Sequence, residues 1–389
     1  MTADNSIDLS VVVPCLNESD TLAVCIRKAL QGIREAGVKG EVIVADNGST
    51  DGSQDIAAKE GARVVPVAAK GYGNALMGGI AAAQGRWIVM GDADDSYDFR
   101  EIPKFVAKLR EGCELVQGCR LPSGGGTVAP GAMPWSHRWI GNPMFSALAA
   151  RWFRAPIHDV YCGLRAFTKD LYLRLDQRCT GMEFATEMII KSSLGGAKIG
   201  EVPITLHKDG RVAHAPHLRT FRDGWRTLRF FLLCTPQWLF MIPGLTLLLV
   251  GAVAWALALP GVKVAGASFD AHTLLVGSMM IICGFLAVCL GMLTEKFAIS
   301  EGILPDRPRA RPGEWLLRLE PGLLLSAGLF ALGLALIAVV FLRWAGGGFG
   351  LLDYAQTMRL VVPGTTLCVL GVQLFFVVFL GSVLELRRK

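Results

Sequence analysis

Apolar and polar positions divide the chain into two unlike halves. Up to about residue 235, short apolar runs alternate with segments in which apolar residues recur at helical spacing. The runs lie at 9–14, 41–46, 62–67 and 86–90, and the helical segments between them include 20–36 and 73–84. Short buried strands that alternate with helices are typical of a mostly parallel sheet covered by helices on both faces. This half of the sequence therefore predicts an α/β domain.

After residue 235 the pattern changes to long apolar stretches that carry almost no charge. The four stretches lie at about 236–259, 271–294, 320–342 and 360–384. Each has about 20 residues or more, the length of helix that crosses the hydrocarbon core of a bilayer. We therefore expect four transmembrane helices and an integral membrane protein.

The lysine and arginine residues of the loops predict how these helices cross the membrane. The connection at 296–316 contains the basic residues Lys296, Arg307, Arg309 and Arg311, and the chain ends with Arg-Arg-Lys at 387–389. Basic loops favour the cytoplasmic side. Because four spans return the chain to its starting side, we expect the α/β domain, this loop and the C-terminus to face the cytoplasm, across the cytoplasmic (inner) membrane.

Two segments before the spans combine apolar and basic residues at helical spacing, namely 133–155 and 218–233. Amphipathic helices of this kind lie in the plane of the membrane interface. We expect both to lie there, with packing on the surface of the α/β domain as the alternative. The predicted organisation is an α/β domain at 1–217, an amphipathic helix at 218–235 and a membrane domain at 236–389.

The ten cysteines and the net charge of +6 narrow the class of protein. The cysteines show no Cys-x-x-Cys pair and no spacing with histidine that would indicate a metal or redox site. We expect them to be reduced and to act as small apolar residues. Basic residues concentrate near the apolar stretches, which suits anionic lipid head groups better than nucleic acid. The expected partner is thus a membrane and not a nucleic acid.

Asp92 and Asp94 are the strongest sign of chemistry in the sequence. They follow the apolar run 86–90, and Asp46 ends the run 41–46. Ligands of parallel sheets bind beyond the carboxyl ends of the strands, so these carboxylates are expected at one cleft. Two carboxylates at i and i+2 can reach one Mg²⁺ or Mn²⁺, which would neutralise the charge of a nucleotide diphosphate. We therefore predict a metal-assisted nucleotide-sugar site.

Seven short motifs follow one another between residue 9 and about residue 230. They are Val-Pro-Cys-Leu-Asn-Glu at 13–18, Val-Ala-Asp-Asn-Gly-Ser-Thr-Asp-Gly at 44–52, Lys-Gly-Tyr-Gly-Asn-Ala at 70–75, Asp-Ala-Asp at 92–94, Gly-Cys-Arg at 118–120, Asp-Val-Tyr-Cys-Gly-Leu-Arg at 159–165 and Glu-Val-Pro-Ile at 201–204. In these motifs the chain resembles the polyprenyl-phosphate glycosyltransferases of glycosyltransferase family 2, which include dolichyl-phosphate mannose and dolichyl-phosphate glucose synthases. The four apolar stretches resemble the membrane portion of some members.

The resemblance implies a GT-A-type domain, in which the nucleotide lies across the edge of one sheet. It implies a nucleoside pocket lined by Pro14, Asn17, Glu18 and Asp46. Asp92 and Asp94, with Ala93 between them, would hold the donor phosphates through the metal, and Arg120 would meet the acceptor phosphate. The chain departs from many members at Ala45, where they have a second acidic residue, so the base of the nucleotide does not follow from this position.

Several other side chains have two interpretations each. Lys70 either neutralises the donor diphosphate or is a solvated turn lysine. Asp159 and Arg165, which with Asp94 and Arg120 form the predicted catalytic set, either act at the site or pair with each other. Glu187 faces either the site or the core. The basic residues expected at the acceptor phosphate or lipid head groups, besides Arg120, are Lys208, Arg211 and Arg219.

The acceptor chemistry sets the expected mechanism. A phosphate monoester has a second pKa of about 6, so a lipid phosphate is already nucleophilic at neutral pH and needs cations rather than a base. Direct displacement would invert the anomeric centre and give a β-linked polyprenyl-phosphate sugar. We predict a metal-dependent inverting hexosyltransferase that uses UDP-glucose or GDP-mannose. The alternative donor is a UDP-N-acetylhexosamine, and homo-oligomerisation is left open.

Two other classes of protein compete with this interpretation. Processive polysaccharide synthases carry a Gln-x-x-Arg-Trp motif, which this sequence lacks. A non-catalytic transport or scaffold protein that only binds a nucleotide sugar would not need both Asp92 and Asp94. The spans of a transporter would also be expected to carry ionisable groups along a polar path, and these spans have almost none.

Overall fold

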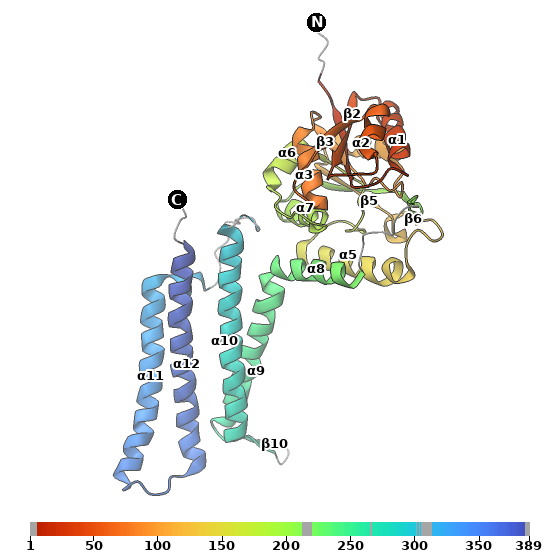
Figure 1. Cartoon of the computed structure of the whole chain (residues 1–389). Coiled ribbons are helices and arrows are strands. Elements are labelled where there is room, and N and C mark those ends of the chain that lie inside the picture. The colour runs from red at the N-terminus through yellow and green to blue at the C-terminus, as the bar shows by residue number, and fades with distance from the viewer. Residues whose placement is uncertain are drawn as a thin grey trace. The chain divides into compact units, whose positions relative to one another are not determined.

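The computed structural model describes residues 6–211, 220–264, 267–300, 302, 304 and 313–385. The chain divides into two compact units, Met1–Phe231 and Leu232–Lys389. Figure 1 shows the path of the chain through the elements of each unit.

A seven-stranded sheet forms the centre of the first unit, with the strand order β3-β2-β1-β4-β7-β5-β8. The strands are β1 (Leu9–Cys15), β2 (Gly40–Asp46), β3 (Arg63–Pro66), β4 (Trp87–Met90), β5 (Leu115–Cys119), β7 (Arg165–Thr168) and β8 (Ile199–Pro203). Neighbouring strands are parallel, except that β7 runs antiparallel to both β4 and β5. The mostly parallel sheet confirms the predicted GT-A-like α/β fold class.

Helices and short connections complete this unit. The helices are α1 (Leu22–Glu35), α2 (Ser53–Lys59), α3 (Tyr72–Ala82), α4 (Ile102–Arg110), α5 (Asn142–Phe153), α6 (Lys169–Leu175), α7 (Glu183–Leu194) and α8 (Thr220–Leu233), with 3₁₀ turns at Phe99–Glu101 and Pro122–Gly124. A separate parallel pair is formed by β6 (Thr127–Val128) and β9 (Thr205–Leu206).

Strand β1 is apolar throughout because helices cover both faces of the sheet. Val11 and Val13 belong to the buried cluster that includes the apolar side of α1. Val12 points to the other face, where a Cβ on Gly79 of α3 would lie only 2.5 Å from its Cγ1. Alternate residues of the strand therefore pack on opposite helical layers, as a central parallel strand requires.

The parallel strands bring three loops to one edge of the sheet. β1 ends at Cys15, β2 at Asp46 and β4 at Met90, and the three strands pair in parallel. The loops that follow these strands carry Asn17, Glu18 and the Asp92–Asp94 pair. The carboxyl edge of the sheet thus gathers the residues that the motifs single out.

Helices α5 and α8 lie side by side in the first unit (Figure 1). The buried ring of Phe231 packs edge-on against Phe145 and Phe153, with ring centroids 5.9 and 5.2 Å apart. The helix predicted at 133–155 is regular only from Asn142 to Phe153, and a π-helical turn at His137–Gly141 precedes it. Large apolar side chains nevertheless remain exposed here: Trp135, Trp139, Ile140, Met144 and Trp225.

The second unit contains four helices that are long and apolar enough to span a membrane. Among the described residues they are Gln237–Ala258, Ala271–Ser300, Leu319–Gly346 and Tyr354–Leu384, which confirms the four predicted spans. The first comprises a π-helical turn at Gln237–Met241 and α9 (Ile242–Ala258); the others are α10 (Ala271–Ser300), α11 (Leu319–Gly346) and α12 (Tyr354–Glu385). A two-stranded ladder, β10 (Lys263–Val264) and β11 (Ala267–Ser268), lies between α9 and α10.

Glycines set the distance between paired membrane helices. A Cβ on Gly251 of α9 would lie 2.7 Å from the carbonyl oxygen of Gly277 in α10. In the second pair, a Cβ on Gly333 of α11 would lie 2.5 Å from the carbonyl oxygen of Gly364 in α12. The backbones can approach this closely only without side chains, which is a common basis of helix association in membranes. Arg307, Arg309, Arg311 and the tail 387–389, on which the predicted orientation rests, lie outside the described residues.

Candidate active site

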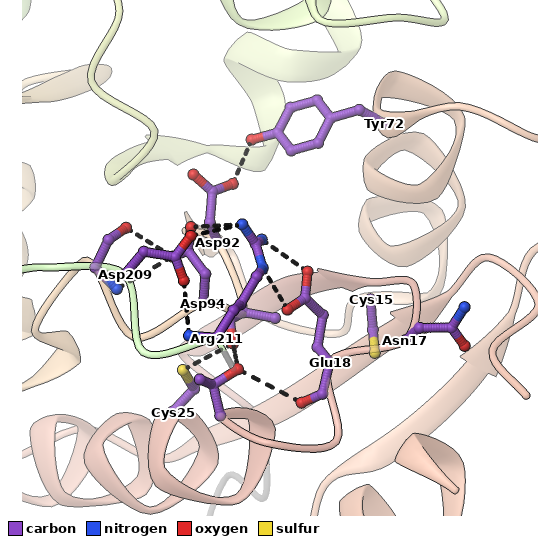
Figure 2. A network of polar contacts seen from close by, with 12 residues as sticks. Cys15, Asn17, Glu18, Cys25, Tyr72, Asp92, Asp94, Asp209 and Arg211 are labelled. Carbon is purple, nitrogen blue, oxygen red and sulfur yellow. Dashed lines mark hydrogen bonds and ion pairs between the residues drawn. The ribbon is translucent and has the colours of Figure 1, made fainter. Parts of the chain in front are cut away.

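The two aspartates of the Asp-x-Asp motif lie in the loop directly after β4 (Figure 2). The Tyr72 hydroxyl, at the start of α3, donates to Oδ1 of Asp92 at 2.9 Å. Oδ1 of Asp94 accepts from the backbone N–H and the hydroxyl of Ser96, at 3.1 and 2.6 Å. Burial, together with the charge of Asp94, raises the pKa of Asp92 to about 6. The neighbouring carboxylates of Asp92 and Asp94 form an anionic site.

Arg211 approaches this site from a distant part of the chain. Its Nε and Nη2 donate to the two carboxylate oxygens of Glu18, each at 2.7 Å. Its Nη1 donates to Asp209 at 3.0 Å and lies 3.4 Å from Oδ2 of Asp94. Burial by itself acts to lower the pKa of Arg211, but the Glu18 hydrogen bonds and the neighbouring carboxylates raise it. Arg211, predicted at the acceptor phosphate, is therefore already bound to carboxylates of the candidate donor site.

Hydrogen bonds join the loops after β1 and β2. Asn17, in the left-handed conformation with φ of 60°, accepts from the backbone N–H of Thr50 through Oδ1 at 2.8 Å. Its own N–H donates to the hydroxyl of Ser49 at 3.0 Å. Pro14 lies in β1 opposite Ala45 of β2. These contacts hold the expected wall of the nucleoside pocket in one conformation.

Asp46 organises its own loop. Its carboxylate accepts from the backbone N–H groups of Gly48 and Ser49, each at 3.1 Å, and from Nε2 of Gln54 at 2.7 Å. The residue is 1% exposed. Asp46 therefore holds the turn after β2, and its predicted contact with the nucleoside stays a prediction.

Asn47 and Lys70 connect this loop to the start of α3. The Asn47 amide donates to the carbonyls of Val67 and Ala69, at 2.9 and 2.7 Å, and its Oδ1 accepts from the N–H of Gly71 at 2.9 Å. The Lys70 ammonium donates to the backbone carbonyl of Asn47. Lys70 is thus folded over the turn at the sheet edge, and its predicted role at the donor diphosphate stays a prediction.

Arg120 and Asp159 form a buried ion pair with two parallel hydrogen bonds. Nε and Nη2 of Arg120 donate to the Asp159 carboxylate at 2.7 and 2.9 Å, and the backbone N–H of Arg120 donates to it at 3.0 Å. The residues are 7% and 0% exposed. Burial acts to lower the pKa of Arg120, but the charge and hydrogen bonds of Asp159, together with Tyr97 and Cys162, raise it well above its usual value. Nη1, which contacts the Tyr97 hydroxyl at 3.3 Å, is the nitrogen that does not bind Asp159.

Asp159 therefore pairs with Arg120 and not with Arg165, the partner that the sequence left open. Arg165 is fully buried and donates to the carbonyl oxygens of Cys162 and Ala185, at 2.7 and 2.6 Å. Burial lowers the pKa of Arg165. Its contacts join the turn before β7 to α7, which is a structural use of the guanidinium.

Glu187 is a buried residue of α7, and it binds a loop that packs against the start of α3. It is paired with Lys191 at 2.8 Å and accepts from the backbone N–H groups of Arg178 and Cys179, at 3.0 and 2.9 Å. The same loop places the Thr180 carbonyl 2.6 Å from where a Cβ on Gly71 would be. Glu187 thus helps to position the Gly71–Gly73 turn, and with it Tyr72, through the loop that contains Thr180.

The structure brings some of the predicted residues together and keeps others apart. Glu18, Asp94 and Arg211 meet in one network, and Asp92 lies beside it (Figure 2). Arg120 and Asp159 form their own buried pair. Lys208 is exposed, Ala93 is buried between the aspartates, and Arg219 lies outside the described residues. Tyr72 was not singled out from the sequence, although it stands in the Lys-Gly-Tyr-Gly motif, because nothing local shows that its hydroxyl reaches Asp92.

The acidic site fits a divalent cation that is bound together with a phosphate ligand. Among the described residues, no group of three or more His, Cys, Asp and Glu side chains is placed to hold a metal alone. Mg²⁺ commonly takes one or two carboxylates and completes its shell with phosphate oxygens and water. Asp92 and Asp94 offer only oxygen ligands, and the charge of Asp94, which adds to burial in raising the pKa of Asp92, is one that a cation would offset.

Comparison with known proteins places the chain in a family. The profile described as "Glycosyl transferase family 2" matches residues 10–175, and that described as "Glycosyltransferase family 2 C-terminal transmembrane region" matches residues 292–385. A low-salt glycan biosynthesis hexosyltransferase of Haloferax volcanii is 36% identical over 394 residues, which cover 99% of this chain and 92% of the relative. A dolichyl-phosphate hexose transferase of the same organism is 32% identical over 51% of this chain and 82% of its own length.

Among solved structures, glucosyl-3-phosphoglycerate synthase from Mycobacterium tuberculosis, in complex with Mn²⁺, UDP and glucosyl-3-phosphoglycerate, aligns with a TM-score of 0.45. It is 24% identical, and the alignment covers 58% of this chain and 78% of that one. The full-length match to the hexosyltransferase agrees with both family profiles, with the motif order and with the two-unit organisation. The protein is a glycosyltransferase and belongs to glycosyltransferase family 2.

Proposed function

We propose that this protein transfers a hexosyl group from a UDP- or GDP-hexose to a polyprenyl phosphate in the membrane. The observation that carries the proposal is the combination, in one chain, of an anionic site at the end of β4 with four helices of membrane-spanning length. A chain that binds a water-soluble sugar donor and also carries membrane spans is suited to an acceptor that lies in the lipid bilayer. The names of the two Haloferax relatives, a hexosyltransferase and a dolichyl-phosphate hexose transferase, support this substrate pair.

The donor would lie across the carboxyl edge of the sheet. Pro14, Asn17 and Asp46 would form the nucleoside wall, and Lys70 would face the diphosphate. Mg²⁺ or Mn²⁺ on Asp92 and Asp94 would neutralise the charge that develops on the leaving nucleoside diphosphate. Tyr72 contributes by fixing one oxygen of Asp92, so that the other oxygen points in a defined direction.

The acceptor phosphate would supply its own nucleophile. One of its ionised oxygens attacks the anomeric carbon, while the bond from that carbon to the diphosphate oxygen breaks and the nucleoside diphosphate leaves with the electron pair. The displacement inverts the anomeric centre and needs no protein base, because the attacking oxygen carries no proton. Arg120 through Nη1 and Lys208 are the cations proposed to offset repulsion between the two phosphate groups, whereas the Arg211 guanidinium is already paired with Glu18.

The exposed aromatic residues around α5 and α8 suit a membrane interface. Trp135, Trp139 and Trp225 are 68%, 54% and 59% exposed. Exposing such large aromatic side chains to water is unfavourable, whereas they are common where a protein meets lipid head groups. Arg226 and Arg229 of α8 are exposed as well. We propose that this surface rests on the cytoplasmic leaflet and brings the lipid phosphate to the site.

The test is product formation by the full chain in nanodiscs. Protein is incubated with Mg²⁺, undecaprenyl phosphate and, in separate reactions, radiolabelled UDP-glucose, GDP-mannose and UDP-N-acetylglucosamine. We expect label to enter the lipid extract with one hexose donor, and NMR of the product to show the β anomer. Asp94→Ala is the matched inactive control. Donor binding without transfer to any lipid phosphate would support the binding-only alternative and refute the proposal.

A further inference from the structure

The contacts of Arg211 have a consequence for metal binding. Asp94 has one oxygen, Oδ1, that is held by the N–H and hydroxyl of Ser96. The other, Oδ2, faces the Arg211 guanidinium at 3.4 Å. Oδ2 is therefore the oxygen that Asp94 has to offer a metal, and a cation of the protein already approaches it. Arg211 and a divalent ion compete for the same oxygen.

Arg211 is held in this place by strong contacts. Arg211 forms a bidentate ion pair with Glu18 through two hydrogen bonds of 2.7 Å, and the side chains of the two residues are 12% and 6% exposed. Charge-assisted bidentate pairs of this kind are among the stronger hydrogen bonds in proteins. Arg211 also neutralises part of the charge of Asp94 and Asp209. Without a cation these carboxylates would repel one another at short range.

The backbone next to Arg211 is hydrogen-bonded to the loop that carries Asp92 and Asp94. The N–H of His207 donates to the carbonyl of Ser96, and the N–H of Gly210 donates to the carbonyl of Asp94, both at 2.9 Å. A Cβ on Gly210 would lie 3.0 Å from Cγ2 of Thr21, so the segment packs tightly there. The segment 207–211 thus places its arginine at the carboxylates through contacts of its own.

We propose that Arg211 is a positioning residue that serves as the internal counter-ion of Asp94 and Glu18, and that it yields Oδ2 of Asp94 to the divalent cation when the donor binds. The inference rests on the proposed function, because it takes Asp94 as a ligand of that cation. It goes beyond it by giving Arg211 a role before any substrate is present. Arg211 keeps the carboxylates in place, and metal binding has to overcome its attraction for Asp94.

The role predicts opposite effects on metal affinity and on stability. In Arg211→Gln the competing charge is gone, so Mn²⁺ alone, titrated by electron paramagnetic resonance into full-length protein in detergent, should bind about fivefold more tightly or better, the lower end of ordinary coupling between sites. The metal-free variant should melt at a lower temperature than the parent, and saturating Mn²⁺ should narrow that gap. A residue with only a packing role would lower both stability and Mn²⁺ affinity.

Two further variants control for folding and for charge. Arg211→Met is close in volume and also uncharged, and it replaces Arg211→Gln if the latter does not fold. Arg27→Gln removes the same charge from an exposed pair with Glu60 and should leave the Mn²⁺ affinity unchanged, since solvent screens distant charges. Unchanged or weaker Mn²⁺ binding in the folded Arg211 variants would overturn the proposal. Because this measurement needs no sugar or lipid, it can succeed even if the proposed substrates are wrong.

Discussion

The buried pair of Arg120 and Asp159 makes a quantitative prediction. Asp159→Asn keeps the shape of the side chain and removes its charge, which leaves the guanidinium of Arg120 in a site that is 7% exposed. In the parent, three N–H groups of Arg120 donate to the Asp159 carboxylate at 2.7 to 3.0 Å. Breaking one side of a buried ion pair costs about 3–5 kcal/mol, because the remaining charge is neither solvated nor paired.

This loss should be visible as a change in melting temperature. For a unit of this size, 1 kcal/mol corresponds to about 2–4 °C, so Asp159→Asn should lower the melting temperature of the first unit by about 6–20 °C. The assay is thermal unfolding of the full chain in detergent, followed by circular dichroism and tryptophan fluorescence. The transition that shifts when UDP or GDP is added with Mg²⁺ identifies the first unit.

The exposed pair of Arg27 and Glu60 provides the matched control. Its side chains are 59% and 26% exposed, so Glu60→Gln should cost no more than about 1 kcal/mol and shift the transition by a few degrees at most. If the melting temperature of Asp159→Asn lay as close to that of the parent as the melting temperature of this control does, the argument from burial would be refuted. If it lay that close and the variant also lost turnover, Asp159 would act in the chemistry, as the motif suggested.

Three other predictions concern the site and the membrane surface. Asp92→Asn and Asp94→Ala should each lower turnover by about a hundredfold or more, and EDTA should abolish activity until Mg²⁺ or Mn²⁺ is restored; full activity in excess EDTA would remove the metal from the mechanism. The pKa of Asp92 is raised from 3.8 to about 6, so the folded state binds its proton more tightly than the unfolded state. The free energy of unfolding of the metal-free protein should therefore fall as the pH rises from 3.8 to about 6. Asp92→Asn should lack this pH-dependent loss in melting curves from pH 4 to pH 7. Replacing exposed Trp139 and Trp225 together by alanine should reduce transfer to long-chain polyprenyl phosphate in nanodiscs and spare a short, water-soluble prenyl phosphate; equal loss on both acceptors would place these residues elsewhere in the reaction.

The local pattern of the sequence determined the α/β class, the four spans and the position of the aspartates. Each of these follows from a window of a few residues to about twenty: alternating apolar runs, unbroken apolar stretches, and a carboxylate pair after a strand. The polar ends of β2 and β4 could be placed at one edge because parallel strands share their direction. The seven motifs added the family, which the full-length relative confirms.

Only the tertiary structure decided which charges meet. Glu18 and Arg211 are 193 positions apart, and no local period relates them. Arg120 could have faced a phosphate, and Asp159 could have paired with Arg165; the antiparallel insertion of β7 between β4 and β5 buries Arg165 among backbone carbonyls and leaves Asp159 to Arg120. Likewise Tyr72 reaches Asp92 only because α3 starts beside the end of β4. A short stretch of sequence determines whether it forms a helix, a strand or a membrane span. Which charged residues pair depends on how elements that are distant in the sequence pack against one another.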